Sequence, residues 1–218
     1  MEIRCHDIGK KFQRDWIFRH VDLSIPSASH MGIVGSNGSG KYTLLQIISG
    51  YLSPSEGEIT HHNQAAAIDR EQLFKQVSWC TPAVQFIDGF TLLENIRFAT
   101  QFKPLISGMT YDAWVDRTGL GDHRHKKLEE LSSGMRQRVK LAWAICSESK
   151  LLLLDEPVSH LDKHAVTWYQ NLLQDFKGER TIVVASNANE DELFSCTHRI
   201  DVTPFKPTSS GAQAAVNH

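Results

Sequence analysis

The chain has 218 residues, of which 41% are hydrophobic and 22% charged, as in an ordinary globular domain. Its formal net charge of −2 excludes the strongly basic surface that binds nucleic acid or an anionic membrane. No stretch approaches the ~18 apolar residues of a membrane helix, and no signal sequence is expected, so another chain would have to cross any membrane. The cysteines are widely scattered, which predicts reduced, mostly buried thiols. They are Cys5, Cys80, Cys146 and Cys196.

The first third of the chain predicts strands around a glycine-rich turn. Residues 1–12, 17–26 and 57–63 have the pattern of an antiparallel sheet at one edge of the fold. Residues 31–35 predict a short buried strand, and residues 42–50 predict a helix that ends at a glycine. The inward positions of residues 17–26 would be Ile17, Val21, Leu23 and Ile25.

The middle of the chain is helical and its end returns to alternating strands and helices. Thr91 and Glu94 form a capping-box pattern, and a helix begins there. Further helices are expected at residues 110–120, 133–148 and 165–176, and buried strands at 150–157 and 181–186.

This order predicts an α/β fold of the P-loop NTPase kind. A mostly parallel sheet would carry helices on both faces, with an antiparallel β subdomain at one edge and a helical subdomain inserted at about residues 88–147. Residues 1–203 would form a single domain, and residues 204–218 a disordered tail. The pairs His61–His62 and His123–His125 lack Cys or carboxylate partners at ligand spacing, so we expect surface imidazoles there.

Residues 35–41, "GSNGSGK", fit a phosphate-binding loop between a buried strand and a helix. The glycines let several backbone N–H groups face an anion, the helix adds its N-terminal dipole, and Lys41 adds a positive charge for the β- and γ-phosphates. The candidate nucleotide contacts are Gly35, Ser36, Asn37, Gly38, Ser39, Gly40, Lys41, Tyr42 and Thr43.

Tyr42 departs from the phosphate-loop pattern, which has Ser or Thr at this position. The short hydroxyl of Ser or Thr binds Mg²⁺, whereas the tyrosine hydroxyl lies at the far side of a ring. Thr43 is turned ~100° further around the helix and is a poor substitute as a metal ligand. Mutating the residues that hold a metal's ligands in place already lowers metal affinity or activity ~10–100-fold, and loss of a ligand itself should lower it at least as much. We therefore expect Tyr42 to weaken Mg²⁺-dependent turnover more than nucleotide binding.

Two further stretches carry chemistry. Asp155 and Glu156 end a buried apolar strand, where unpartnered carboxylates are costly. Asp155 would hold Mg²⁺ through water, and Glu156 would act as general base on the attacking water, unless both simply end the strand in solvent. In "LSSGMRQ", Ser132, Ser133 and Gly134 begin a helix, either as an anion site or as an N-cap.

In this order, "GSNGSGK", "LSSGMRQR", "LLLLDEP" and "SHLD" resemble the nucleotide-binding (ATPase) subunit of an ATP-binding cassette (ABC) transporter, over residues 1–203. The resemblance implies that Mg-ATP is bound and hydrolysed in a head-to-tail dimer of two copies. Ser132, Ser133 and Gly134 of one copy would contact the ATP held by the other. It also implies a cytoplasmic protein attached to the membrane through a separate permease, which the helical insert would contact. The slightly acidic charge, by contrast, predicts no nucleic-acid partner.

The resemblance implies further roles and shows several departures. Phe12, or alternatively Trp16, would stack on adenine, and Asp162 would link the two sites of the dimer. The glutamine expected as a metal ligand falls at Pro82, with Gln85 as a substitute. Asn187 replaces the switch histidine and can donate a hydrogen bond without carrying charge. Ser133 and Met135 replace the usual glycine and glutamine.

Two alternative functions remain open from the sequence. One is a non-transport ABC ATPase, although neither a second cassette nor a long coiled-coil insert is visible. The other is an ATP-gated dimer switch that hydrolyses slowly, which Tyr42, Pro82 and Asn187 favour. The transported substrate and the direction of transport depend on the permease.

Overall fold

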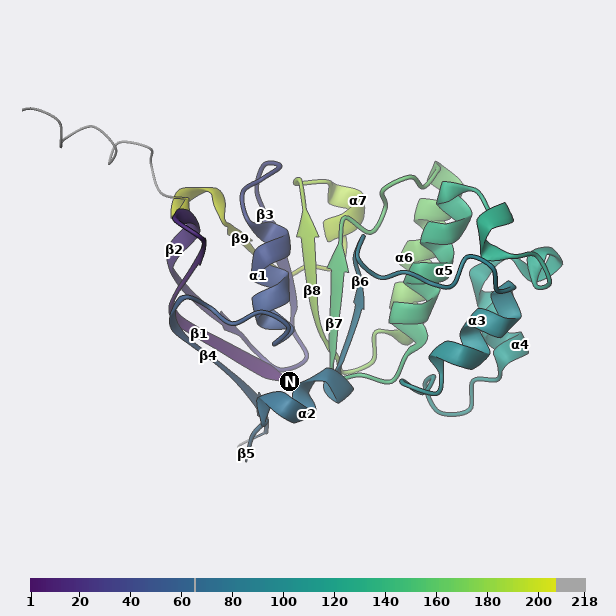
Figure 1. The fold of residues 1–218 in the computed structure, drawn as a ribbon, viewed down its shortest axis with the longest axis horizontal. Helices are drawn as coiled ribbons and strands as arrows, with labels where there is room; N and C mark the ends of the chain where they lie inside the picture. Colours follow the sequence, from purple (N-terminus) through teal and green to yellow (C-terminus); the bar gives the residue numbers. More distant parts are fainter. Residues whose placement is uncertain (65, 207–218) are drawn as a thin grey trace, which may run out of the picture.

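The computed structural model describes residues 1–64 and 66–206, which form two sheets and a helical region beside them (Figure 1). The antiparallel sheet has the order β2-β1-β4-β5, and the five-stranded parallel sheet has the order β6-β7-β8-β3-β9. Both predicted sheets are thereby confirmed. The strands are β1 (Glu2–Phe12), β2 (Asp15–Ile25), β3 (His30–Val34), β4 (Glu56–Asn63), β5 (Ala66–Ala67), β6 (Val77–Cys80), β7 (Leu151–Asp155), β8 (Thr181–Ser186) and β9 (His198–Asp201).

Helices cover both faces of the parallel sheet, as predicted. In Figure 1, α1 lies between the two sheets, whereas α5 and α6 lie on the other side of the parallel sheet with α3 and α4 beyond them. The α-helices are α1 (Lys41–Ile48), α2 (Arg70–Gln76), α3 (Leu92–Ala99), α4 (Tyr111–Thr118), α5 (Ser133–Cys146), α6 (Lys163–Phe176) and α7 (Glu190–Leu193). The 3₁₀ helices are η1 (Gly121–His123), η2 (Leu128–Glu130) and η3 (Thr203–Phe205).

Strand β7 divides its side chains between two hydrophobic cores, because successive strand residues point to opposite faces. Leu151 and Leu153 pack in the core that contains α1 and the antiparallel sheet. Leu152 and Leu154 pack in the core built with α5 and α6. All four leucines are fully buried, so β7 is fixed from both sides and presents Asp155 at its end.

Helix termini follow the local sequence signals. Thr91 Oγ1 accepts a hydrogen bond from the Glu94 N–H at 3.2 Å, and Glu94 Oε2 accepts one from the Thr91 N–H at 2.8 Å, which confirms the capping box. Gly50 has φ 77° just beyond α1, and a Cβ there would lie 2.6 Å from Leu73 Cδ2. The predicted glycine end of α1 is therefore also confirmed.

The predicted inward positions of β2 are correct from Val21 onward and wrong at Ile17. Phe18 is fully buried instead, and Ile17 is partly exposed. The cause is a β-bulge, which adds a residue and shifts the alternation. His20 has φ 59° and Asp7 on the neighbouring strand has φ 47°, where the β1–β2 register shifts.

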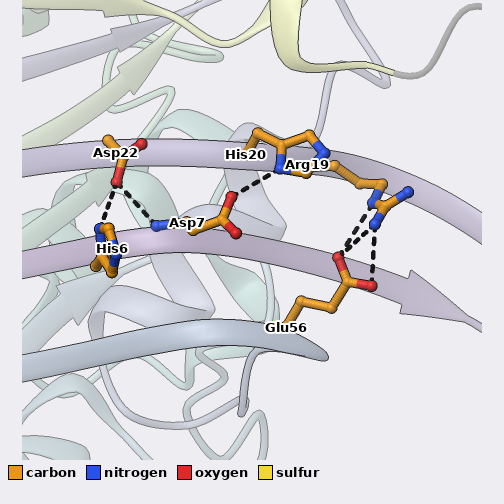
Figure 2. Close-up of polar contacts among 6 residues, drawn as sticks. All are labelled: His6, Asp7, Arg19, His20, Asp22 and Glu56. Atoms are coloured by element: carbon orange, nitrogen blue, oxygen red, sulfur yellow. Dashed lines mark hydrogen bonds and ion pairs between the residues drawn. The ribbon is translucent and has the colours of Figure 1, made fainter.

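The outer face of this sheet carries polar side-chain pairs near the bulge (Figure 2), two between β1 and β2 and one that reaches across β1 from β2 to β4. Solvent screens such pairs, so they contribute little to stability. The pairs are His6 Nδ1–Asp22 Oδ1 at 3.0 Å, His20 Nδ1–Asp7 Oδ1 at 2.7 Å and Arg19 Nη2–Glu56 Oε2 at 2.8 Å.

His61 is not the surface imidazole that the sequence predicted. It is 7% exposed and its Nε2 donates to the Ile48 carbonyl, 2.7 Å away, at the end of α1. The polar neighbours of His61 in sequence were misleading because β4 turns this position toward α1. The thiols are as predicted: Cys5, Cys80 and Cys146 are buried and Cys196 is partly so, and burial raises the pKa of each.

The folded region continues past the predicted boundary at residue 203. Residues 203–205 form η3, and Phe205 packs partly against the core. The rest of the expected tail, residues 207–218, lies outside the described residues. Within residues 1–64 and 66–206, none of the helices combines the length and apolar character that crossing a bilayer requires.

Candidate functional site

The loop between β3 and α1 wraps tightly against the antiparallel sheet. Gly38 and Gly40 have φ values of 74° and 99°, a region that L-residues rarely adopt. A Cβ on Gly40 would lie 2.8 Å from Ile17 Cγ2 and 2.9 Å from Phe18 Cδ1. We call residues 35–41 the phosphate loop; its shape requires glycine at position 40 for both conformation and space.

Lys41 reaches back over the phosphate loop. Its Nζ donates to the carbonyls of Gly35 (2.8 Å) and Ser36 (3.2 Å) and to Asn187 Oδ1 (2.6 Å). The residue is only 6% exposed. Three neutral oxygens therefore hold one ammonium beside the N-terminus of α1, where backbone N–H groups and the helix dipole favour an anion.

Asn187 connects the phosphate loop with the end of β7. Its Nδ2 donates to Glu156 Oε1 and to Asn37 Oδ1, each at 2.8 Å. The carboxyl ends of neighbouring parallel strands meet at one edge of a sheet, and Asn187 follows β8 while Glu156 follows β7. The structure thus brings together three residues that the sequence predicted as catalytic: Lys41, Glu156 and Asn187.

The acidic pair at the end of β7 has two different environments. Glu156 has φ 44°, a strained conformation for a non-glycine residue, and its N–H donates to the Ala185 carbonyl at 2.9 Å. This turn directs the Glu156 carboxylate to Asn187. Burial and the neighbouring Glu156 raise the pKa of Asp155 to about 6, against the opposing effect of Lys41.

The residues around this site do not supply the usual oxygen ligands of Mg²⁺. Tyr42, the second residue of α1, stands where a short hydroxyl is needed, and Pro82 has no side-chain oxygen. Gln85 is exposed and lines a cavity of about 200 Å³ with Arg136 and Lys140, whose lining does not include Asp155. Of the expected protein ligands, the Asp155 carboxylate stands at the end of β7 and the Thr43 hydroxyl lies one position beyond Tyr42 in α1. The chain therefore lacks the short hydroxyl and the nearby glutamine that would complete the expected Mg²⁺ site.

Residues 131–137, the signature segment, begin α5 and contact the loop that follows Glu156. Ser132 is the N-cap: its Oγ accepts from the Met135 N–H at 3.3 Å. A Cβ on Gly134 would lie 2.9 Å from the His160 carbonyl oxygen, and Gln137 Nε2 donates to the Pro157 carbonyl at 3.0 Å. The N-cap interpretation is confirmed, and the anion-binding role of Ser132, Ser133 and Gly134 stays a prediction.

The structure distinguishes the two candidate adenine-stacking residues. The Trp16 ring has the Arg19 guanidinium carbon at 4.4 Å and Lys11 Nζ at 5.2 Å from its centroid. Phe12 is 47% exposed, with Lys10 Nζ at 5.2 Å. The Phe12 ring is thus the more open of the two, and stacking on adenine stays a prediction for either residue.

Gln137 is a contact residue of the site that the sequence did not single out. Its carboxamide spans from α5 to the residue after Glu156, and only its place within "LSSGMRQ" could have indicated this.

Asp162 caps α6, with its Oδ1 accepting a hydrogen bond from the Ala165 N–H at 2.8 Å. This contact lies within one chain, so the expected role of Asp162 in linking the two nucleotide sites of a dimer stays a prediction.

A parallel sheet with a glycine-rich loop, a lysine and a strand-end carboxylate at its carboxyl edge defines a P-loop nucleotide-binding protein. Residues 18–159 match the family model described as ABC transporter. The uncharacterised ABC transporter ATP-binding protein YybJ of Bacillus subtilis is 31% identical over 201 residues, 89% of this chain and 89% of that protein. The chain therefore belongs to the ABC transporter family, as a nucleotide-binding subunit.

Other relatives and solved structures agree with this assignment. The taurine import ATP-binding protein TauB of Ruegeria pomeroyi is 31% identical over 183 residues, 80% of this chain and 66% of that protein. A putative ABC transporter ATP-binding protein from Pyrococcus furiosus has a TM-score of 0.79 at 18% identity, over 95% of this chain and 100% of that chain. The dimeric bacterial ABC transporter cassette MJ0796 has a TM-score of 0.77 at 22% identity, over 92% and 95%. At these sequence identities, the similarity to the two solved structures supports only the fold.

Proposed function

We propose that this chain binds and hydrolyses ATP in a head-to-tail dimer and thereby drives a separate membrane permease. The observation that carries this proposal is the hydrogen-bonded group of Lys41, Asn187 and Glu156 at the carboxyl edge of the parallel sheet. Such an edge is where α/β proteins bind ligands, and this group offers a cation, an amide donor and a base within one contact network.

Each residue has a chemical role in the proposal. The N–H groups of the phosphate loop bind phosphate oxygens, and Lys41 exchanges its neutral partners for the β- and γ-phosphates. Glu156 takes a proton from the attacking water, and Asn187 donates to the γ-phosphate. Phe12 stacks on adenine. No step is assigned to a metal, because the expected Mg²⁺ site is incomplete.

The proposed partners are a second copy of this chain and a membrane permease. Ser132, Ser133 and Gly134 of a second copy would complete the nucleotide site from across an interface, with Asp162 near that interface. One relative is named as an import ATP-binding protein and one similar structure is dimeric, which supports a permease partner and a dimer. The protein would then lie on the cytoplasmic face of a membrane, with the helical insert of residues 88–147 toward the permease.

Nucleotide binding by Lys41→Met tests this function. We expect the purified chain to bind a fluorescent ATP analogue and Lys41→Met to bind it ~10–100-fold more weakly, since a hydrogen bond to a charged group contributes about 1.5–3 kcal/mol. Lys126→Met, at an exposed position outside the site, is the matched control and should bind normally. Absence of ATP binding by the unmodified chain, or unchanged binding by Lys41→Met, would overturn the proposal.

A second candidate function is an ATP-gated dimer switch with slow hydrolysis. Tyr42 favours it, because it removes a metal ligand while the phosphate loop stays intact. ATPase measurements on the ATP-bound dimer separate the two functions. Turnover far below the ~1 s⁻¹ at the low end of common enzymes would support the switch.

A further inference from the structure

We propose that this site binds ATP without Mg²⁺, because Tyr42 withholds a metal ligand and Lys206 supplies a second positive charge at the phosphate loop. This inference rests on the proposed ATP binding. It adds that the bound species is ATP without Mg²⁺. It also adds Lys206 as a nucleotide-binding residue.

The first argument is the chemistry of the positions that would ligate the ion. Mg²⁺ requires oxygens at about 2.0–2.1 Å in near-ideal octahedral geometry. Tyr42 carries its hydroxyl beyond a ring, and Pro82 offers no side-chain oxygen. The residue before it, Thr81, is 2% exposed, and its hydroxyl is closed off from solvent, so it is not available to a hydrated ion.

The second argument is the charge gathered at the phosphate loop. Lys206 Nζ donates to the Gly38 carbonyl at 3.4 Å, because η3 brings the end of the described chain to this loop. In Figure 1, η3 and the loop between β3 and α1 lie at the same end of the molecule. Lys41 at the end of the loop and Lys206, far away in the sequence, thus place two positive charges at the loop.

Both lysines can transfer their hydrogen bonds to a triphosphate at little cost. The bonds they make now go to neutral oxygens: three for Lys41 and the Gly38 carbonyl for Lys206. Replacing such an acceptor by a phosphate oxygen gives a stronger, charge-assisted bond. Two ammonium groups and the N-terminus of α1 then offset the charge that Mg²⁺ usually neutralises.

The test compares nucleotide affinity in excess Mg²⁺ and in excess EDTA, with a fluorescent ATP analogue and the full chain. We expect the two dissociation constants of the unmodified protein to agree within about twofold. The Tyr42→Ser variant should bind the ATP analogue at least ~10-fold more tightly in Mg²⁺ than in EDTA, because changes at metal sites typically alter metal affinity by that factor. Tyr42→Phe is the matched control and should behave as the unmodified chain, because the phenol is not a ligand.

Lys206 is tested separately in EDTA. Lys206→Gln should weaken binding about tenfold, the effect of one charged hydrogen bond, whereas Lys126→Gln should not. Each variant is first shown to keep the thermal unfolding midpoint of the unmodified chain. Equal affinity of Lys206→Gln and the unmodified chain in EDTA would overturn the role of Lys206.

The outcomes separate this inference from the proposed function. Binding that is tenfold tighter with Mg²⁺ in the unmodified chain, or a Mg²⁺ dependence that Tyr42→Phe abolishes, overturns the inference while ATP binding stands. No binding in either solution overturns both.

Discussion

Asn187 joins the Lys41 ammonium and the Glu156 side chain through a neutral amide. Its Oδ1 accepts from Lys41 Nζ at 2.6 Å, and its Nδ2 donates to Glu156 Oε1 at 2.8 Å. Asn187→Asp keeps the acceptor but places a second carboxylate against Glu156 and near the phosphates. We expect ATP binding to weaken at least about tenfold, since like charges a few ångströms apart repel by about 4 kcal/mol at an effective dielectric constant near 20. Titration with a fluorescent ATP analogue measures this.

Asn187→Ala is the control for charge, because it removes the same hydrogen bonds without adding a carboxylate. Its affinity should fall less than that of Asn187→Asp, because it loses hydrogen bonds to charged partners, worth about 1.5–3 kcal/mol each, but adds no repulsion. If Asn187→Asp and Asn187→Ala bind ATP equally, the contact with Glu156 and Lys41 does not control nucleotide affinity.

Single residues of the site were predictable where chemistry and local pattern coincide. The glycine spacing before Lys41 and the acidic pair after an apolar strand are local signals, and the structure places both at one sheet edge. The bond between Asn37 and Asn187 joins residues 150 positions apart, so no local pattern contains it. The same holds for Gln85, which lines a cavity with Arg136 and Lys140, residues about 50 positions further along the chain.

His61 connects β4 with α1: it lies on β4, and its Nε2 donates a hydrogen bond to the carbonyl of Ile48, the last residue of α1. Burial lowers the pKa of His61 below its usual 6.5, so the unfolded chain takes up a proton more readily than the folded chain. The contribution of neutral His61 to stability is complete above about pH 6.5 and is lost as pH falls below it. We expect His61 to lower the thermal midpoint between about pH 7.5 and about pH 5.5, and His61→Gln to remove that contribution. Asp155, whose pKa is raised to about 6, acts in the opposite direction in both proteins, so the comparison of the two pH profiles isolates His61.

Glutamine retains an N–H donor for the Ile48 carbonyl but cannot be protonated in this range. Partly buried His30, whose pKa burial also lowers, leaves a residual slope in the variant. A wild-type pH slope in His61→Gln would contradict the assignment.

Elements with strong periodicity were predictable, and short or polar ones were not. The helices α3 to α6 and the strands β7 and β8 follow from apolar spacing and capping residues. The strand β6 has four residues and β9 is the polar edge strand "HRID"; both form because neighbouring parallel strands complete their hydrogen bonds. Tertiary pairing rather than local preference decides such strands.

At the scale of the whole molecule, the phosphate loop and the signature segment do not contact each other directly in the hydrogen bonds of the described residues. The phosphate loop is hydrogen-bonded to Asn187, which also bonds to Glu156. The signature segment instead packs on the loop that follows Glu156 and leaves Ser132 and Ser133 exposed. The alternation of strands and helices predicted the α/β core, and the motif order predicted the family. That a second copy completes the site remains a prediction, because it concerns surfaces that no single chain brings together.

Glu156→Gln tests the dimer. The amide oxygen can still accept from Asn187 Nδ2, so the binding network is retained while the general base is lost. We expect this variant to have a mass of 24.6 kDa without nucleotide and twice that with ATP, by light scattering after size exclusion. Adding Ser133→Glu places a carboxylate on the exposed start of α5, toward the partner's triphosphate, and should prevent the dimer without preventing ATP binding. If the double variant still dimerises with ATP, the copies associate through another surface and the signature segment does not close the site.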